Sequence, residues 1–176
     1  MQVHKERVYS ICLRMLANTA EAEDIAQEVF VRAFVSIHSF REEAQLSTWL
    51  YRIAVNLCKN RLKYQSRRHY KRHRDLDGLP ESAAGRGVGK TSGEMSARPD
   101  EILEGLCAET RIQKALMDVE PDFRSLLILR DIQGLTYLDI MNLTGLAEGT
   151  VKSRLHRARG ALRRAYIAQD DMKMTA

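Results

Sequence analysis

Apolar residues recur at every third or fourth position between Gln2 and Leu62, the spacing of helices that bury one face. We expect three helices in this stretch. The first ends near Asn18, the second begins at Thr19, a residue type that caps helix N-termini, and the third is capped by Ser47. The residues predicted to be buried are Val8, Ile11, Cys12, Met15, Ala22, Ile25, Ala26, Val29, Phe30, Ala33, Ile37, Leu50, Ile53, Ala54 and Leu57. Three short amphipathic helices predict a small helical bundle.

The periodicity disappears between Gln65 and Arg98. This stretch begins with a basic run, residues 67–74, and continues with glycines, prolines and small polar residues. Such a composition does not predict a packed element, and we expect a flexible linker here.

The helical pattern resumes at Asp100 and ends in the outline of a helix-turn-helix. One helix precedes Pro121, which opens the next helix, and that helix stops at Gly134. A short helix, a turn containing Gly145 and a long basic helix over residues 148–167 follow. The residues predicted to be buried are Ile102, Leu103, Leu106, Ile112, Ala115, Leu116, Val119, Phe123, Leu126, Leu127 and Ile128.

The predicted fold class is therefore all-α, with two small helical domains joined by a flexible linker and a helix-turn-helix at the end of the second. The expected boundaries are residues 1–65 for the first domain, 66–99 for the linker, 100–168 for the second domain and 169–176 for a tail.

Composition narrows the function classes only slightly. Hydrophobic residues make up 44% and charged residues 29% of the 176 residues, as in ordinary globular proteins. The net charge of +5 is compatible with a polyanionic partner. The three cysteines are far apart and predict neither disulfides nor a zinc site, and we expect Cys12 and Cys58 to be buried free thiols. With no signal peptide and no apolar run of membrane length, the chain is expected to be cytoplasmic and not inserted in a membrane.

Cations crowd the final helix, whose buried stripe is predicted to be Val151, Leu155, Ala158 and Leu162. The residues left facing outward, where a recognition helix meets base edges, are Lys152, Ser153, His156 and Arg157. Arg154 and Arg159 lie to the sides, within reach of phosphates. A basic helix can also be merely solvated, but the preceding short helix and Gly145 favour DNA binding.

A second basic zone lies at the end of the first domain. Its cations are Arg52, Lys59, Arg61 and Lys63, and its interleaved aromatic residues are Trp49, Tyr51, Tyr64 and Tyr70. Cations that follow phosphates, together with rings on which bases stack, suit melted DNA. The alternative is a disordered basic tail, and Trp49 taken alone is better explained as a core residue.

The outward face of the second helix is different in character, with Asp24, Gln27, Glu28 and Arg32 at helical spacing. Such a face could receive a basic partner helix, although the residues by themselves favour a solvated surface.

Catalytic and cofactor sites are not predicted. Residues 84–91 loosely match a phosphate-binding loop but lack the strand before it and the helix after it, so we set nucleotide binding aside. His69 and His73 could share a helical face, but no third metal ligand is evident. We therefore expect no enzyme, no metal and no cofactor.

Three segments together resemble the extracytoplasmic-function (ECF) sigma factors. Residues 22–30, Ala-Glu-Asp-Ile-Ala-Gln-Glu-Val-Phe, resemble region 2.1–2.2 of that family. Ser-Phe-Arg at 39–41 with residues 47–56 resembles region 2.3–2.4, and residues 135–137 with 149–159 resemble region 4.2. The resemblance covers nearly the whole chain, although the linker is longer than expected and family members usually carry further residues ahead of the position of Gln2.

This resemblance implies an alternative sigma factor that binds core RNA polymerase, through its β-prime coiled coil and β flap, and promoter DNA. Asp24, Gln27, Glu28 and Arg32 would then contact polymerase, which reverses the expectation of a solvated face. The residues implied at the −10 element are Phe40, Arg41, Trp49, Arg52, Asn56, Lys59, Arg61 and Lys63. Those implied at the −35 element are Lys152, Ser153, Arg154, His156, Arg157 and Arg159. An anti-sigma protein is a further expected partner, and the alternative reading is a stand-alone helix-turn-helix regulator.

Overall fold

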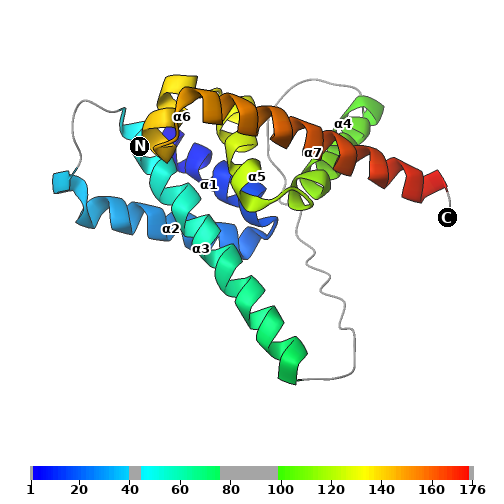
Figure 1. Cartoon of the computed structure of the whole chain (residues 1–176), viewed down its shortest axis with the longest axis horizontal. Coiled ribbons are helices and arrows are strands. Elements are labelled where there is room, and N and C mark those ends of the chain that lie inside the picture. Colours follow the sequence, from blue (N-terminus) through cyan, green and yellow to red (C-terminus); the bar gives the residue numbers. More distant parts are fainter. Residues whose placement is uncertain (1, 40–44, 76–98, 175–176) are drawn as a thin grey trace. The chain divides into compact units, whose positions relative to one another are not determined.

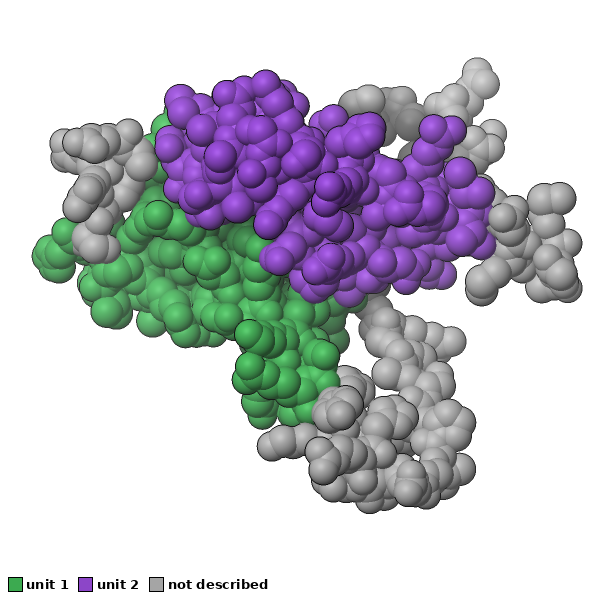
Figure 2. Space-filling model, viewed as in Figure 1, with its two compact units in different colours: residues 1–86 green, residues 87–176 purple. Residues whose placement is uncertain are grey.

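The computed structural model describes residues 2–39, 45–75 and 99–174, and within these ranges every regular element is a helix. The chain divides into two compact units, residues 1–86 and 87–176 (Figure 2). The predicted all-α fold with two helical domains is therefore confirmed. Most of the expected linker, residues 76–98, lies outside the described residues.

Unit 1 is a three-helix bundle of α1 (Gln2–Leu16), α2 (Thr19–Val35) and α3 (Leu46–Asp75), with a short 3₁₀ helix η1 (Ile37–Ser39) after α2 (Figure 1). Each of the three α-helices packs against the other two. The predicted stripes form the core, with three exceptions: Phe30 and Ile53 are only half-buried, and Ile37 is exposed. Periodicity alone thus identified most of the core of this unit but missed Leu16 and Val55. Tyr51, predicted among the aromatic residues of the basic zone, is also buried, at 2% exposed.

Both predicted caps in unit 1 were wrong, by one residue in α2 and by two in α3. Asn18, not Thr19, caps α2, because its side-chain oxygen accepts a hydrogen bond of 3.1 Å from the backbone N–H of Glu21. The preceding residue, Ala17, adopts a left-handed φ of 53°, which ends α1 and leaves Asn18 extended. Helix α3 begins before Ser47, since the N–H of Trp49 already donates to the Gln45 carbonyl at 3.2 Å.

The larger correction concerns the basic run, which is helical as far as Asp75. Arg and Lys are good helix formers, and no glycine or proline interrupts the chain before Gly78, so the helix propagates beyond the bundle. The Arg68 guanidinium also lies 5.9 Å from the Tyr64 ring centroid one turn earlier. The absence of apolar periodicity therefore marked an exposed helix in this segment.

The two buried thiols of unit 1 confirm the prediction for Cys12 and Cys58. A hydrogen bond with Cys12, together with burial, raises the pKa of the Cys58 thiol, so the group stays protonated and unreactive at neutral pH. These thiols join α1 to α3 as ordinary packing groups.

Unit 2 comprises α4 (Pro99–Met117), α5 (Pro121–Leu127), a π-helical turn η2 (Ile128–Ile132), α6 (Tyr137–Thr144) and α7 (Glu148–Met174). Helix α7 packs against α4, α5 and α6 and is the axis of the unit. The predicted core is confirmed at Ala115, Leu116, Val119, Leu126, Leu127 and Ile128. Phe123 is only partly buried and Ile112 is exposed, contrary to prediction, while the side chains of Ile102, Leu103 and Leu106 lie outside the described residues.

A helix-turn-helix is present in unit 2 as predicted. Thr136 and Asp139 form a capping box at the start of α6, with the N–H of Asp139 donating to the Thr136 hydroxyl at 3.1 Å. Gly145 ends α6 in a left-handed conformation with φ of 71°, which a glycine adopts without strain. Helix α7 then begins at Glu148 and continues past the predicted end at Ile167.

Arg124 is a buried cation that sequence reasoning missed. Its side chain is 3% exposed, and its Nη2 donates to the carbonyls of Met117 at 2.7 Å and Val119 at 2.9 Å. Burial lowers the pKa of this guanidinium, while the charge of Asp118 acts in the opposite direction. Arg124 therefore satisfies carbonyls at the C-terminal end of α4 and joins α4 to α5.

Candidate functional site

Helix α7 presents a polar face opposite its buried stripe. Val151, Leu155 and Ala158 are buried as predicted, and Leu162 is partly buried against the same core. The side chains of Ser153, His156 and Arg157 are exposed on the opposite side. The N-terminal half of the helix thus offers a hydroxyl, an imidazole and a guanidinium to a partner.

Lys152 lies on the flank of α7 and is restrained within unit 2. Its Nζ is 2.6 Å from Glu148 Oε1 and 5.7 Å from the ring centroid of Tyr137. The Arg130 guanidinium also lies over this ring, 4.6 Å from its centroid. The hydrogen bond between the two side chains lowers the pKa of Glu148 and raises the pKa of Lys152, so both are charged at neutral pH.

Arg159 lies on the same flank and is held by an acid that the sequence reading did not single out. Its Nε and Nη2 donate to the two carboxylate oxygens of Asp131 at 3.0 and 2.6 Å. This contact raises the pKa of Arg159. Arg154, on the other side of α7, is half-buried. Five of the six predicted residues are thus exposed, and two of these five, Lys152 and Arg159, are also paired with acids of unit 2.

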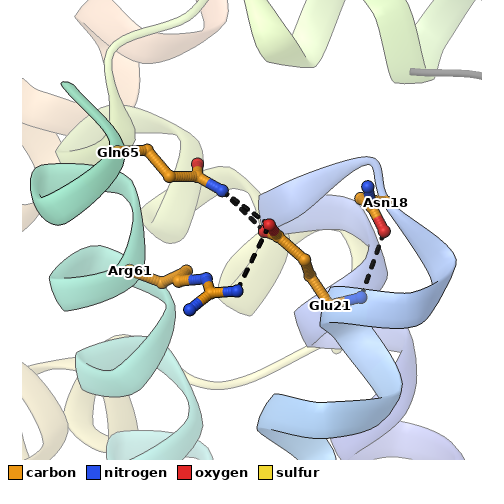
Figure 3. A network of polar contacts seen from close by, with 4 residues as sticks. All are labelled: Asn18, Glu21, Arg61 and Gln65. Carbon is orange, nitrogen blue, oxygen red and sulfur yellow. Dashed lines mark hydrogen bonds and ion pairs between the residues drawn. The ribbon is translucent and has the colours of Figure 1, made fainter. Parts of the chain in front are cut away.

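The residues of α3 that are predicted to contact DNA differ in exposure. Arg52, Asn56 and Lys63 are exposed, and Lys59 is half-buried. Arg61 contacts Glu21 of α2 at 3.4 Å, and the Gln65 amide donates to the same carboxylate at 2.7 and 2.8 Å (Figure 3). Arg61 therefore fastens α3 to the first turn of α2, a role that sequence reasoning did not foresee.

Three further predicted residues complete the account of this surface. Trp49 is 7% exposed and belongs to the core, in agreement with the interpretation of that residue taken alone. Phe40 and Arg41 lie outside the described residues. The structure therefore brings Arg52, Asn56, Lys59 and Lys63 together along α3.

The outward face of α2 is polar in its first half and apolar in its second. Asp24, Gln27 and Arg32 are exposed, and Glu28 forms an ion pair of 2.7 Å with Arg32. At 100° per residue, the positions of Asp24, Gln27 and Glu28 continue into Val31, Phe34 and Val35. These three apolar side chains are exposed, Phe34 to 82%. Sequence reasoning found the polar half of this face but not its apolar continuation.

Within the described parts of the chain, no group of three or more His, Cys, Asp or Glu side chains could hold a metal ion. None of the helices described there combines the length and the hydrophobicity of a membrane-spanning segment.

Comparison with known proteins places both units in one family. Residues 1–68 match the family model of sigma-70 region 2, and residues 109–162 match that of sigma-70 region 4. The ECF RNA polymerase sigma factor SigW of Bacillus subtilis is 35% identical over 93% of this chain and 85% of its own length. The chain belongs to the ECF sigma factors. This sigma factor is also 34% identical to the RNA polymerase sigma-H factor of Pseudomonas aeruginosa, over 92% of its own chain and 81% of the relative.

Solved structures agree on the fold. A complex of the sigma factor RpoE with the anti-sigma factor NepR from Bartonella quintana matches with a TM-score of 0.66 at 24% identity, covering 93% of this chain and 92% of that one. CnrH in complex with the cytosolic domain of CnrY matches with a TM-score of 0.61 at 20% identity, covering 95% and 84%. The family models and the relatives confirm the resemblance deduced from the three sequence segments.

Proposed function

We propose that this ECF sigma factor binds core RNA polymerase and directs initiation at promoters that carry a −10 and a −35 element. It does so without catalysis of its own, in the cytoplasm where polymerase and chromosome lie. The observation that supports this most directly is the pairing, in one chain, of an acidic and apolar face on α2 with exposed cationic surfaces on α3 and α7.

The polymerase contact is proposed on α2. Asp24, Gln27, Glu28 and Arg32 would meet the β-prime coiled coil, and the β flap would contact unit 2. The exposed Phe34 supports this assignment, because a bare aromatic ring next to charged groups is typical of a buried interface anchor with a polar rim.

The promoter contacts are proposed on α3, α7 and the segment between η1 and α3. Arg52, Asn56, Lys59 and Lys63 would follow the melted strand near the −10 element, with Phe40 and Arg41 nearby and Trp49 and Arg61 supporting the surface from within. Lys152, Ser153, His156 and Arg157 would read bases of the −35 element, while Arg154 and Arg159 would contact its phosphates. Two weak contacts on one tether favour promoters with both elements at the right spacing.

An anti-sigma protein is the proposed regulatory partner. Both similar solved structures are complexes, one named as a sigma factor with its anti-sigma factor. A protein that covers the face of α2 would withhold the sigma factor from polymerase.

The test is run-off transcription with the purified full-length chain and core RNA polymerase on a library of genomic fragments. We expect new start sites, each preceded by a shared pair of elements. Reversal of charge in the double variant Asp24→Lys, Glu28→Lys should abolish co-purification with core enzyme, because both acids would then repel a basic partner. The matched control reverses two exposed acids elsewhere, Glu6→Lys and Glu120→Lys, and should co-purify normally.

Three results would contradict the proposal. The wild-type chain could fail to associate with core enzyme, could leave start sites unchanged, or could protect a DNA site by itself as strongly as with polymerase. The last result would favour a stand-alone regulator.

A further inference from the structure

The first turn of α7 carries an acid, Glu148, that forms an ion pair with Lys152. Both side chains are more than half exposed, at 55% and 57%, and they stand one turn apart at the N-terminal end of α7. Residues at this end of a recognition helix are the ones that reach base edges. An acid there is repelled by phosphates, which makes its presence on a DNA-binding helix costly unless it meets a hydrogen-bond donor.

The geometry of the pair matches the edge of one base pair. In the major groove, guanine presents the acceptors N7 and O6, and the paired cytosine presents its N4 amino donor beside them. An ammonium donates where guanine accepts, and a carboxylate accepts where cytosine donates. The 2.6 Å between Nζ and Oε1 places the donor and the acceptor side by side, as they must be to reach the two bases of one pair.

The pair is also held in place before any partner arrives. The ring of Tyr137 in α6 lies against Lys152 at 5.7 Å, and the same ring is contacted by Arg130 at 4.6 Å. This stacking limits the rotamers of Lys152 and reduces the entropy lost when it binds a base.

We propose that Glu148 and Lys152 together read a single G·C base pair of the −35 element, with Glu148 as the specificity-determining residue. This inference rests on the proposed function and adds to it one recognised base pair. The simpler alternative is that Glu148 only stabilises the N-terminus of α7 and pairs with Lys152 in solvent.

The experiment measures initiation by the full-length chain with core polymerase on promoters whose −35 element is randomised one position at a time. The wild type should favour G·C at one position by about tenfold, the size expected of one good base contact. Glu148→Ala should reduce that preference to about twofold. Lys152→Ala should reduce the preference at the same position. The double variant should lose no more of this preference than the more affected single variant, because both side chains contact one base pair.

The matched control is Glu120→Ala, which removes an exposed acid of unit 2 outside α7 and should leave every preference unchanged. Thermal melting of each variant, read by circular dichroism, confirms that it is folded. If Glu148→Ala increases initiation equally from all −35 variants, or changes nothing, Glu148 reads no base and the inference fails while the sigma factor stands. If the wild-type chain directs no start sites at all, the proposed function falls and this inference with it.

Discussion

The outward faces of α2 and α7 are opposite in character, although both helices bury an apolar stripe of the same spacing. The face of α2 combines acids with bare Val31, Phe34 and Val35. The outward side of α7 carries Ser153, His156 and Arg157 instead, with Lys152 and Arg159 on its flank. A large exposed apolar side chain gains free energy only by leaving water, which a protein partner permits and a phosphate backbone does not.

The comparison shows that two amphipathic helices can be assigned different partners from their solvent-facing residues. An apolar centre with a charged rim is the anatomy of a protein interface, whereas a polar cationic face without apolar centre suits nucleic acid. The α3 surface is intermediate in character, because one of its cations, Arg61, forms an ion pair within the bundle.

The largest effect should come from removing the apolar centre of the α2 face. Phe34→Ala is expected to weaken the affinity for core polymerase by about 2 kcal/mol, or roughly 30-fold, because an anchoring ring is lost from the interface. Affinity measured by fluorescence titration with core enzyme tests this. The melting temperature should hardly change, since the ring is exposed in the free chain. Unaltered affinity would place the polymerase contact elsewhere.

A comparable effect is expected from the loss of a base contact on α7. Arg157→Ala should cost roughly 1–3 kcal/mol at the −35 element and relax the preference at one base position. Competition of promoter variants for the holoenzyme measures it. An equal loss on all DNA sequences would instead make Arg157 a phosphate contact.

A smaller effect is expected where α3 is tied to α2. Glu21→Gln removes the charge that holds Arg61 and Gln65, so unit 1 should lose about 1 kcal/mol of unfolding free energy in urea titration. The matched substitution Glu23→Gln removes a neighbouring exposed acid and should cost less. Equal costs would show that the network in Figure 3 adds nothing to stability.

The smallest effect should follow loss of the exposed ion pair on the α7 flank. Asp131→Ala is expected to lower unfolding free energy by less than about 1 kcal/mol, since both partners are substantially exposed. If Asp131 positions Arg159 for DNA, the same variant should weaken promoter binding and should not add to the effect of Arg159→Ala. Full additivity in this double-mutant cycle would show that Asp131 and Arg159 affect promoter binding independently.

Sequence alone predicted the helices and most of the core. A helix that is buried on one side repeats apolar residues at every third or fourth position, as at Val8, Ile11 and Met15. It missed contacts that depend on how helices meet. Arg124 is buried because carbonyls at the end of α4 lie within its reach, and no local pattern signals this. Asp131 forms an ion pair with Arg159 of another helix, and Glu21 forms one with Arg61 across the bundle.

The dependence on tertiary structure also explains the wrong N-cap predicted for α2, and the lack of apolar periodicity explains the wrong start predicted for the linker. Asn18 and Thr19 are both good caps, and only the left-handed turn at Ala17 decides between them. The extension of α3 to Asp75 escaped notice because a solvated helix has no apolar period to display. The predicted base contacts themselves, such as Arg157, remain predictions that only DNA-binding experiments can test.

The distribution of the cysteines has a practical consequence. Cys107 is exposed on α4, whereas Cys12 and Cys58 are sealed between α1 and α3. A maleimide dye should therefore attach to a single site on the native chain and to three on the denatured one. The labelling stoichiometry would then report the opening of the first bundle in real time, while the dye on Cys107 follows the second.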